Sequence, residues 1–408
     1  MSLYRNSAWF LKGVTEFTKN AFISASKRFV EKDLEVSMAG RSFMITGANS
    51  GIGRATAMAI AKKGGTVHMV CRNKDKAEEA RADIVKESGN KEIFVHILDL
   101  SETKKVWEFA ESFKRKYKSL NVLINNAGCI MSQREENTEG LEKSFASNVL
   151  GVYILTKSLI ALLEKSAEPR VVTVSSGGML VQKLRTGNLQ TDRGRYDGAM
   201  VYAQNKVREK PRFRQSKVRE EPRFRQSKVR EEPRFRQSKV REEPRFRQSK
   251  VREEPRFRQS KVREEPRFRQ SKVREEPRFR QSKVREEPRF RQSKRQQVVI
   301  TEQLAKNHLN IHFSVMHPGW VDTPAVANAM PEFHSSMRES LRTPEQGADT
   351  AVWLAVSHAA ATMPSGHFYQ DRKMVSAHLP LAWTRSSSLE EQKFMFSLED
   401  LAKSHQPH

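Results

Sequence analysis

Apolar runs of strand length recur along the chain and alternate with helical patterns. The six runs are four to six residues long, at Ser42–Thr46, Thr66–Val70, Ile93–Leu98, Leu120–Ile124, Val171–Val174 and Ile311–Met316. Continuous apolar runs of this length are typical of strands buried on both faces, whereas Arg54–Ala61 has the periodicity of a helix. Strands that alternate with helices predict an α/β fold, with a doubly wound parallel sheet of the Rossmann type.

One segment breaks the alternation. Residues 207–294 are eight copies of the eleven-residue unit Val-Arg-Glu-Glu-Pro-Arg-Phe-Arg-Gln-Ser-Lys, and only the first copy differs, with Lys210 in place of Glu. The valine and phenylalanine of each unit fit neither a helix nor a strand period, and the recurring proline prevents one continuous helix. Two apolar residues in eleven cannot form the buried face of a solenoid. We therefore predict a disordered insert in a single domain.

The insert also dominates the charge of the chain. It holds 33 basic and 15 acidic residues, and so supplies 18 of the 26 net positive charges. This charge favours salt-sensitive attraction to polyanions, and we expect no specific nucleic-acid partner. The two cysteines, Cys71 and Cys129, cannot form a disulfide framework, which favours a reducing, intracellular and cytoplasmic location. No run of about 18 apolar residues occurs, so we expect no membrane-spanning segment.

A helical pattern is interrupted by the insert. Reading residues 202–206 directly into residues 295–309 gives one helix, with apolar positions at Val298, Ile300, Leu304, Ala305 and Leu309. With the insert present, Pro211 should end the first half of this helix near Lys210. Near-identical copies also suggest recent expansion of non-coding sequence, in which case the working protein joins Lys206 to Arg295.

Two segments compete to extend the second half of this helix toward its N-terminus. One is Tyr202-Ala-Gln-Asn-Lys206, and the other is Phe290-Arg-Gln-Ser-Lys294 in the last repeat, which has the same register. The local segment has no long loop to close, whereas closing a loop of this length costs several kcal/mol, on the order of (3/2)RT ln n plus a constant. If Phe290 occupies the position, its ring offers no proton.

The sequence divides into five parts. They are a basic amphipathic N-terminal extension (1–37), the first part of the Rossmann-type domain (38–206), the repeat insert (207–294), the second part of the domain (295–375) and a C-terminal tail with a helix (376–408).

A glycine-rich turn follows the first predicted strand. The sequence Gly47-Ala-Asn-Ser-Gly51-Ile-Gly53 leads from the strand into the helical pattern at Arg54. Glycines let the backbone approach a pyrophosphate, and the helix N-terminus offers free N–H groups. The turn therefore predicts a dinucleotide site, and Arg72 after the second strand favours the 2′-phosphate of NADP(H) over NAD(H), with Arg54 as a helper.

Four motifs in order carry a family resemblance. Thr46-Gly-x-x-x-Gly-x-Gly53, Asn125-Asn-Ala-Gly128, the pair Ser175-Ser176 and Tyr202-x-x-x-Lys206 resemble the short-chain dehydrogenase/reductase family. The resemblance covers residues 40–206 and about 295–373. The loop His317-Pro-Gly-Trp-Val-Asp-Thr323 is similar to that of the retinol-dehydrogenase-like branch.

The resemblance implies a set of site residues. Ser176 would orient the substrate carbonyl beside Tyr202, Ser175 would be structural or contact the substrate, and Asn148 would hold a water in a proton relay through Lys206. The implied catalytic residues are thus Asn148, Ser176, Tyr202 and Lys206. The implied cofactor-binding residues are Gly47, Asn49, Ser50, Gly51, Ile52, Gly53, Arg72, Asp99, Leu100, Asn126, Ala127, Gly128, Tyr202, Lys206, Pro318, Gly319, Val321 and Thr323.

Proton transfer explains why a tyrosine and a lysine are needed four residues apart. A phenol titrates near pH 10, and an ammonium group on the same helix face lowers its pKa toward neutrality. We therefore predict an NADP(H)-dependent oxidoreductase that transfers a hydride between nicotinamide and a carbonyl or alcohol, such as a retinoid or a steroid, without a metal. His312 and His317 are assigned to packing. The alternative is a catalytically silent cofactor-binding or interaction protein, because the insert interrupts the catalytic helix.

The two ends carry amphipathic patterns. Basic and aromatic residues alternate in residues 1–37, which is typical of a membrane-surface segment or mitochondrial address and equally of a helix packed on the domain. Thr343-Pro344 predicts a helix start. Ser387 or Ser388 caps a last helix with Phe394, Met395, Leu398 and Leu401 on one side. Substrate identity, reaction direction and homo-oligomer formation stay open.

Overall fold

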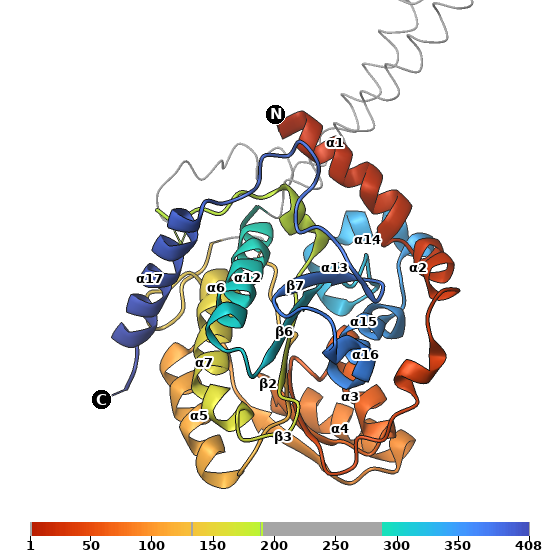
Figure 1. Cartoon of the computed structure of the whole chain (residues 1–408), viewed down its shortest axis with the longest axis vertical. Helices are drawn as coiled ribbons and strands as arrows, with labels where there is room; N and C mark the ends of the chain where they lie inside the picture. Colours follow the sequence, from red (N-terminus) through yellow and green to blue (C-terminus); the bar gives the residue numbers. More distant parts are fainter. Residues whose placement is uncertain (1, 132–133, 188, 191–287, 408) are drawn as a thin grey trace, which may run out of the picture. The chain divides into compact units, whose positions relative to one another are not determined.

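A parallel sheet forms the centre of the domain (Figure 1). The computed structural model describes residues 2–131, 134–187, 189–190 and 288–407. Within these residues the strand order is β3-β2-β1-β4-β5-β6-β7-β8, and every neighbouring pair is parallel except β7 with β8. The predicted α/β doubly wound fold is therefore confirmed. The predicted first half of the catalytic helix, at residues 202–206, and most of the predicted disordered insert lie outside the described residues.

Six of the eight described strands coincide with the predicted apolar runs to within two residues. The strands are β1 (Ser42–Thr46), β2 (Thr66–Cys71), β3 (Ile93–Ile97), β4 (Val122–Asn125), β5 (Arg170–Val174), β6 (His312–Met316), β7 (His367–Gln370) and β8 (Lys373–Met374). The sequence analysis missed β7 and β8. Both are short, and their polar ends leave no apolar run to recognise.

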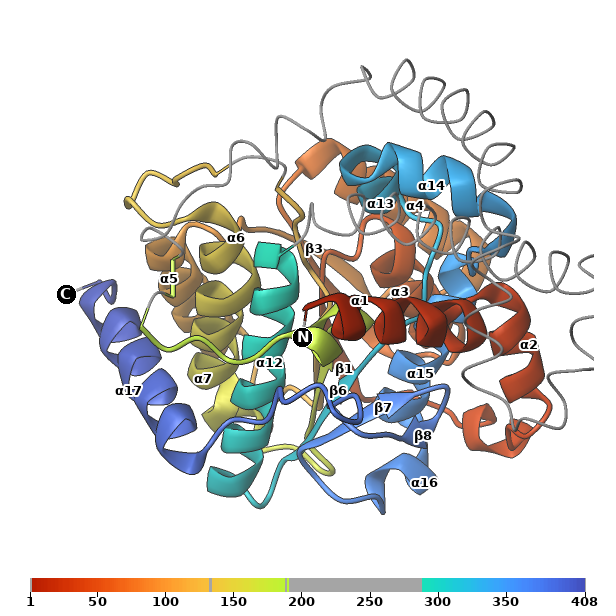
Figure 2. The same ribbon diagram turned by 90° about the horizontal axis from the view of Figure 1, so that it is seen from above.

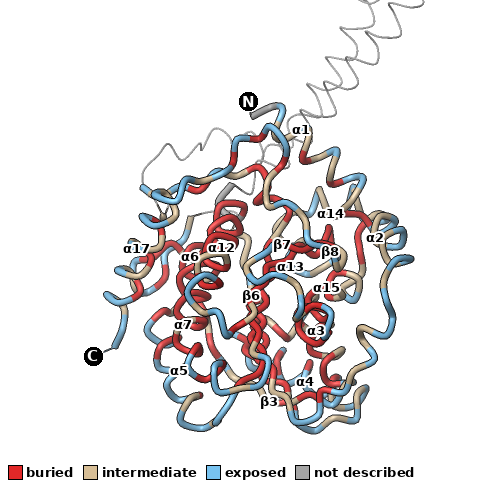
Figure 3. Tube along the Cα trace, in the orientation of Figure 1, coloured by how far each residue is buried: buried red, intermediate tan, exposed pale blue. Residues whose placement is uncertain are grey.

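Helices cover both faces of the sheet (Figures 1 and 2). One face packs against α3 (Gly51–Lys62), α4 (Lys74–Ser88) and α15 (Pro344–Val356). The other packs against α5 (Thr103–Lys116), α7 (Gly151–Leu163) and α12 (Pro288–Asn307). Two apolar clusters result, one on each side of the sheet, and the inner strands β1, β2, β4, β5 and β6 are buried on both faces, as is usual in a parallel sheet (Figure 3).

Seven further helices lie in the described residues, outside the six that cover the sheet. They are α1 (Ser2–Lys12), α2 (Lys19–Ser26), α6 (Lys143–Phe145), α13 (Pro324–Ala329), α14 (Pro331–Met337), α16 (His358–Ala361) and α17 (Ser388–Ser404). Single turns of 3₁₀ or π type occur at η1 (Gly13–Phe17), η2 (Glu31–Leu34), η3 (Ala146–Leu150), η4 (Gly177–Val181) and η5 (Arg338–Ser340).

Helix α12 begins inside the repeat array. It starts at Pro288 and continues through the junction at Arg295. Proline is tolerated in the first turn of a helix because an N–H group there would have no partner within the helix. The array was predicted to be disordered up to residue 294, and the structure corrects this for the last seven residues. They add turns to a helix already nucleated, and residues 291–297 are all buried. Leu309 was wrongly placed on the helix face, because it lies beyond the helix end and is exposed.

The N-terminal extension packs on the domain. Trp9 and Phe17 are buried, and both rings contact Trp320. A Cβ atom added at Gly13 would lie closer than 3.0 Å to the Trp320 ring, a separation real Cβ atoms essentially never show, so η1 lies directly on that ring. The structure thus shows the packed alternative of the two readings, and contact with a membrane surface or a mitochondrial address stays a prediction.

The predicted N-terminal caps of the two helices near the C-terminus, α15 and α17, are confirmed. Thr343 caps α15 in a capping box with Gln346. Ser387, rather than Ser388, caps α17 in a box with Glu390. Phe394 and Leu398 on α17 are fully buried, so the C-terminal helix is part of the core on the α5–α7 side.

One apolar stretch in the described chain has the length and composition of a membrane span. It covers Lys143–Leu163, with a mean hydropathy of 1.6, and most of it is buried inside the domain. The sequence criterion asked for consecutive apolar residues, and this stretch escaped it because serine, asparagine and threonine are interspersed. Its burial against the sheet, α5 and α12 makes it a core helix.

Candidate active site

The glycine-rich turn closes tightly on itself at the carboxyl end of β1. Gly47 and Gly51 have positive φ angles of 67° and 51°, a backbone conformation that favours glycine. A Cβ atom at Gly53 would lie closer than 3.0 Å to the carbonyl oxygen of Gly47 and to the Asn126 side chain. Only glycine therefore fits at position 53, where the first turn of α3 packs directly on Gly47 and Asn126.

Asn126 and Thr46 tie the turn to the end of β4. The Asn126 Nδ2 donates to the carbonyl oxygen of Thr46 at 2.8 Å, and the backbone N–H groups of Asn126 and Ala127 donate to the Thr46 hydroxyl at 3.0 and 2.9 Å. These bonds hold the Asn125-Asn-Ala-Gly128 motif against Gly47. The structure thus brings two predicted cofactor motifs together at one edge of the sheet.

The start of α3 suits an anion. The helix has twelve residues, no acidic residue in its first turn, and a Ser50 side chain that makes no capping bond. Its first N–H groups therefore keep the partial positive charge of a helix N-terminus. Asn49 and Ile52 are half-buried beside Ser50, which is exposed. The residues present fit the pyrophosphate of a dinucleotide.

Arg72 and Arg54 differ in their exposure and in their ion pairing. Arg72 is exposed one residue before Asn73, which caps α4. Arg54 donates to Asp83 at 2.8 Å, so its charge is already partly neutralised. Arg72 is therefore more available to an anionic ligand than Arg54, and the helper role of Arg54 is weakened.

The end of β3 packs against the start of α7. A Cβ atom at Gly151 would lie closer than 3.0 Å to the carbonyl oxygen of Leu100, so the helix approaches this loop as closely as glycine allows. The Asp99 carboxylate accepts from the Ser101 backbone at 2.9 Å and shapes the turn. Asp99 and Leu100 thus lie at the same edge of the sheet as the glycine turn.

Asn148 lies in the π-helical turn η3, a rare form that often occurs at functional sites. Its Oδ1 accepts from the Cys129 N–H at 2.8 Å, and its Nδ2 donates to the Cys129 carbonyl at 2.9 Å. Its backbone carbonyl accepts from the Gln297 side chain at 2.7 Å. These contacts link the segment after β4 to α12.

Lys294, from the last repeat, reaches the same place. Its Nζ donates to the Val174 carbonyl at the end of β5, at 2.8 Å. A Cβ atom at Gly128 would lie 3.3 Å from this Nζ and 3.6 Å from Asn148 Oδ1, so all three groups are close neighbours. Burial lowers the pKa of Lys294 to about 8, and the neighbouring Cys129 partly offsets the effect.

The two serines after β5 have different partners. The Ser175 hydroxyl is buried and donates to the Lys294 carbonyl at 3.0 Å. The Ser176 hydroxyl caps η4 by accepting from the Gly178 N–H at 3.3 Å. Of the alternatives for Ser175, the structure shows a structural contact with α12.

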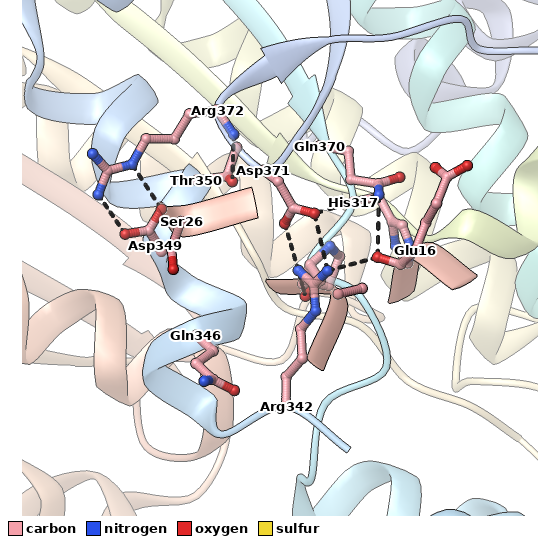
Figure 4. Close-up of polar contacts among 12 residues, drawn as sticks. Glu16, Ser26, His317, Arg342, Gln346, Asp349, Thr350, Gln370, Asp371 and Arg372 are labelled. Atoms are coloured by element: carbon pink, nitrogen blue, oxygen red, sulfur yellow. Dashed lines mark hydrogen bonds and ion pairs between the residues drawn. The ribbon is translucent and has the colours of Figure 1, made fainter. Parts of the chain in front are cut away.

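The loop after β6 is anchored by a buried arginine (Figure 4). Arg342 donates to both carboxylate oxygens of Asp371, at 2.6 and 3.0 Å, and to the Pro318 carbonyl at 3.3 Å. Gly319 has φ +83° and leaves no room for a Cβ beside the guanidinium. Val321 pairs with Arg342 in an isolated bridge.

Thr323 closes this loop and brings it back to the glycine turn. Its hydroxyl accepts from the Val326 N–H at 3.3 Å and caps α13. Its methyl group would lie 3.0 Å from a Cβ at Gly51. The carboxyl ends of β1, β4, β5 and β6 therefore converge.

The histidines pack, as predicted. His312 contacts the Met363 carbonyl at 2.9 Å. The Nδ1 of His317 accepts from the Gly177 N–H at 2.8 Å, and burial holds the pKa of His317 well below its usual range. Within the described ranges no three His, Cys, Asp or Glu side chains gather as metal ligands.

Three supporting residues escaped the sequence analysis. Phe17 stacks edge-on against His317 with ring centroids 4.3 Å apart, and Trp9 donates to the Gly177 carbonyl at 2.7 Å. The N-terminal extension thus supports the loop after β5. Arg342 was missed as well, because no local pattern links it to Asp371. Tyr202 and Lys206 lie outside the described residues.

The site and fold are those of a nicotinamide-type dehydrogenase, and the comparisons specify the class. The short chain dehydrogenase family profile matches residues 41–186. The chain is 47% identical over 403 residues to dehydrogenase/reductase SDR family member 12 of Homo sapiens, covering 99% of each chain. It therefore belongs to the short-chain dehydrogenase/reductase family.

Two further similarities are more partial. Retinol dehydrogenase 12 of Mus musculus is 41% identical over 172 residues, which is 42% of this chain and 54% of that protein. A short-chain type dehydrogenase/reductase from Mycobacterium marinum matches in fold, with a TM-score of 0.51 and 14% identity over 82% of this chain and 96% of that one.

Proposed function

We propose that the domain is an NADP(H)-dependent oxidoreductase acting on a lipophilic carbonyl or alcohol. The observation that carries the proposal is the glycine turn, where a side chain at position 53 has no room between Gly47 and Asn126. Together with the uncapped start of α3, it offers backbone N–H groups to a pyrophosphate. Arg72 supports the preference for a 2′-phosphate.

The reacting residues are Tyr202 and Ser176, in a chain that joins Lys206 to Arg295. When bound, reduced nicotinamide supplies a hydride to the carbonyl carbon. Ser176 orients the carbonyl and the Tyr202 phenol gives a proton to its oxygen. Lys206 lowers the pKa of this phenol, and Asn148 connects the lysine to water. The retinol dehydrogenase relatives support a retinoid or another lipophilic carbonyl as substrate.

For the 408-residue chain we propose the second function, a cofactor-binding protein with little turnover. The specific observation is that α12 begins at Pro288, so position 290, one turn before Lys294, carries phenylalanine. A phenyl ring has no ionisable proton. Cofactor affinity should change far less than turnover, because the glycine turn that would hold the pyrophosphate does not involve this position.

One comparison tests both proposals. NADPH affinity, measured from cofactor fluorescence, should be similar in the 408-residue chain and in a chain joining Lys206 to Arg295. Turnover of all-trans-retinal and a 3-oxosteroid should be at least about a hundredfold higher in the joined chain, the range of general acid catalysis. Gly53→Val should abolish NADPH binding in both, whereas Gly187→Ala is the control, since a Cβ there meets nothing within 4 Å and the backbone φ is not positive. Equal turnover in the two chains would refute the silent form, and binding by Gly53→Val would refute the cofactor site.

A further inference from the structure

Lys294 carries its ammonium group into the interior of the domain, at the carboxyl end of the sheet. Its side chain is buried, and its Nζ lies among the Val174 carbonyl, Gly128 and the Asn148 side chain. Burying an ammonium group is unfavourable unless several polar groups surround it. Here the surrounding groups come from the ends of β4 and β5 and from η3, the elements that carry the candidate active site.

The helix around Lys294 is held in a fixed register. The Ser175 hydroxyl donates to the Lys294 carbonyl, and Gln297 donates to the Asn148 carbonyl. A Cβ atom at Gly178 would lie closer than 3.0 Å to the Arg291 side chain, and the Arg291 guanidinium lies 4.5 Å from the Trp9 ring centre. Slipping by one residue would move Lys294 about 100° around the helix and break all of these contacts.

The repeat carries the same spacing as the catalytic motif. Phe290-Arg-Gln-Ser-Lys294 and Tyr202-Ala-Gln-Asn-Lys206 share an aromatic first residue, a glutamine third and a lysine fifth. On a helix the first and fifth residues lie on one face, about one turn apart. The repeat thus supplies the lysine of the motif at position 294. At position 290 it has phenylalanine, which lacks the hydroxyl group of tyrosine.

We propose that Lys294 has taken the lysine position of the catalytic helix in the 408-residue chain, and that a phenol at position 290 completes a working proton donor. The inference rests on the proposed oxidoreductase function. In the completed site the phenol at 290 gives its proton to the carbonyl oxygen as the hydride of NADPH reaches the carbon, and the phenolate then takes a proton from water. Lys294 acts as a positioning residue that lowers the pKa of this phenol.

The test introduces the phenol into the full chain. Phe290→Tyr is compared with Phe279→Tyr, the same position of the preceding repeat, and Tyr202→Phe is added to both so that residue 202 contributes nothing. The first readout is an ultraviolet difference titration of the added phenol, which requires no substrate. We expect the phenol at 290 to titrate at least about one pH unit below the phenol at 279, an about tenfold shift in its ionisation equilibrium. Lys294→Met should remove the difference, and Lys294→Arg should restore it.

The second readout is NADPH oxidation with a carbonyl that the joined chain reduces, all-trans-retinal or a 3-oxosteroid. Phe290→Tyr should exceed its parent by about a hundredfold, and Phe279→Tyr should equal the parent. Phenols at 290 and 279 that titrate together, or no gain of turnover where the joined chain is active, would overturn the inference. Failure of the joined chain with every carbonyl would refute the proposed function instead, and the titration alone would then decide the place of Lys294.

Discussion

A single buried arginine joins the N-terminal extension, the loop after β6 and the β7–β8 turn. The Arg342 guanidinium is 1% exposed, forms a two-bond ion pair with Asp371, and donates to the carbonyl oxygens of Glu16, Thr18 and Pro318 (Figure 4). Asp371 and Arg372 have φ angles of 50° and 56°, a strained conformation for side chains of this kind. Arg342 thus fixes the β7–β8 turn, the N-terminal extension and the loop after β6.

We predict that Arg342→Met lowers the free energy of unfolding by about 3–5 kcal/mol. Removing one partner of a buried pair leaves the Asp371 carboxylate uncompensated, which has this effect in other proteins. The Asp371 side chain is only 11% exposed, so water cannot replace the guanidinium. Urea unfolding followed by tryptophan fluorescence measures the change. Lys114→Met is the control, because its pair with Glu111 is half exposed and should contribute less than about 1 kcal/mol.

The same substitution should weaken NADPH binding, because the Pro318–Thr323 loop loses its anchor. Asp371→Asn keeps the shape of the pair and removes its charge, so it should have a smaller effect on stability. If Arg342→Met destabilises no more than Lys114→Met, the network stabilises nothing beyond ordinary packing and this reasoning fails. Should NADPH affinity stay unchanged while stability falls, the loop would be independent of Arg342.

Two further predictions concern charge. NADPH should bind at least about tenfold more tightly than NADH, since a charge-assisted contact to the 2′-phosphate contributes about 1.5–3 kcal/mol. Arg72→Ala should remove this preference, whereas the control Lys74→Ala should not. Equal affinities of the parent chain for NADPH and NADH would show that Arg72 is only a solvated surface residue. Burial lowers the pKa of His68 to about 3 and that of His96 to about 4, so both are neutral when folded while unfolded histidine titrates near 6.5. The free energy of unfolding should therefore be highest above about pH 6.5 and fall by about 1–2 kcal/mol per histidine as the pH is lowered to about 5. Urea unfolding of His68→Phe should show a smaller decrease over the same pH range. A decrease equal to that of the parent chain would contradict the contribution of His68.

Short sequence patterns were sufficient to predict the elements that depend on neighbouring residues. The first six strands, the glycine turn and the caps at Thr343 and Ser387 follow from apolar runs, glycine geometry and the positions of side-chain oxygens. Contacts between distant segments could not be predicted in this way. The pairs Arg342–Asp371, Trp9–Gly177 and Phe17–His317 join residues that no short motif connects. These contacts depend on the tertiary structure.

The start of α12 shows why the fold and the chemistry respond differently to the repeats. Residues 291–297 are helical and buried, and they contact Ser175 and Asn148 through the Lys294 carbonyl and the Gln297 side chain. Each repeat ends in the same Phe-Arg-Gln-Ser-Lys sequence, so the residues immediately before Arg295 stay the same whatever the number of copies. The segment that packs into the core at the start of α12 is therefore the same for any number of copies. In the mechanism proposed above, proton transfer depends instead on a hydroxyl at position 290, and the repeat encodes phenylalanine there. We therefore expect further copies of the unit to leave the start of α12 unchanged without supplying that hydroxyl.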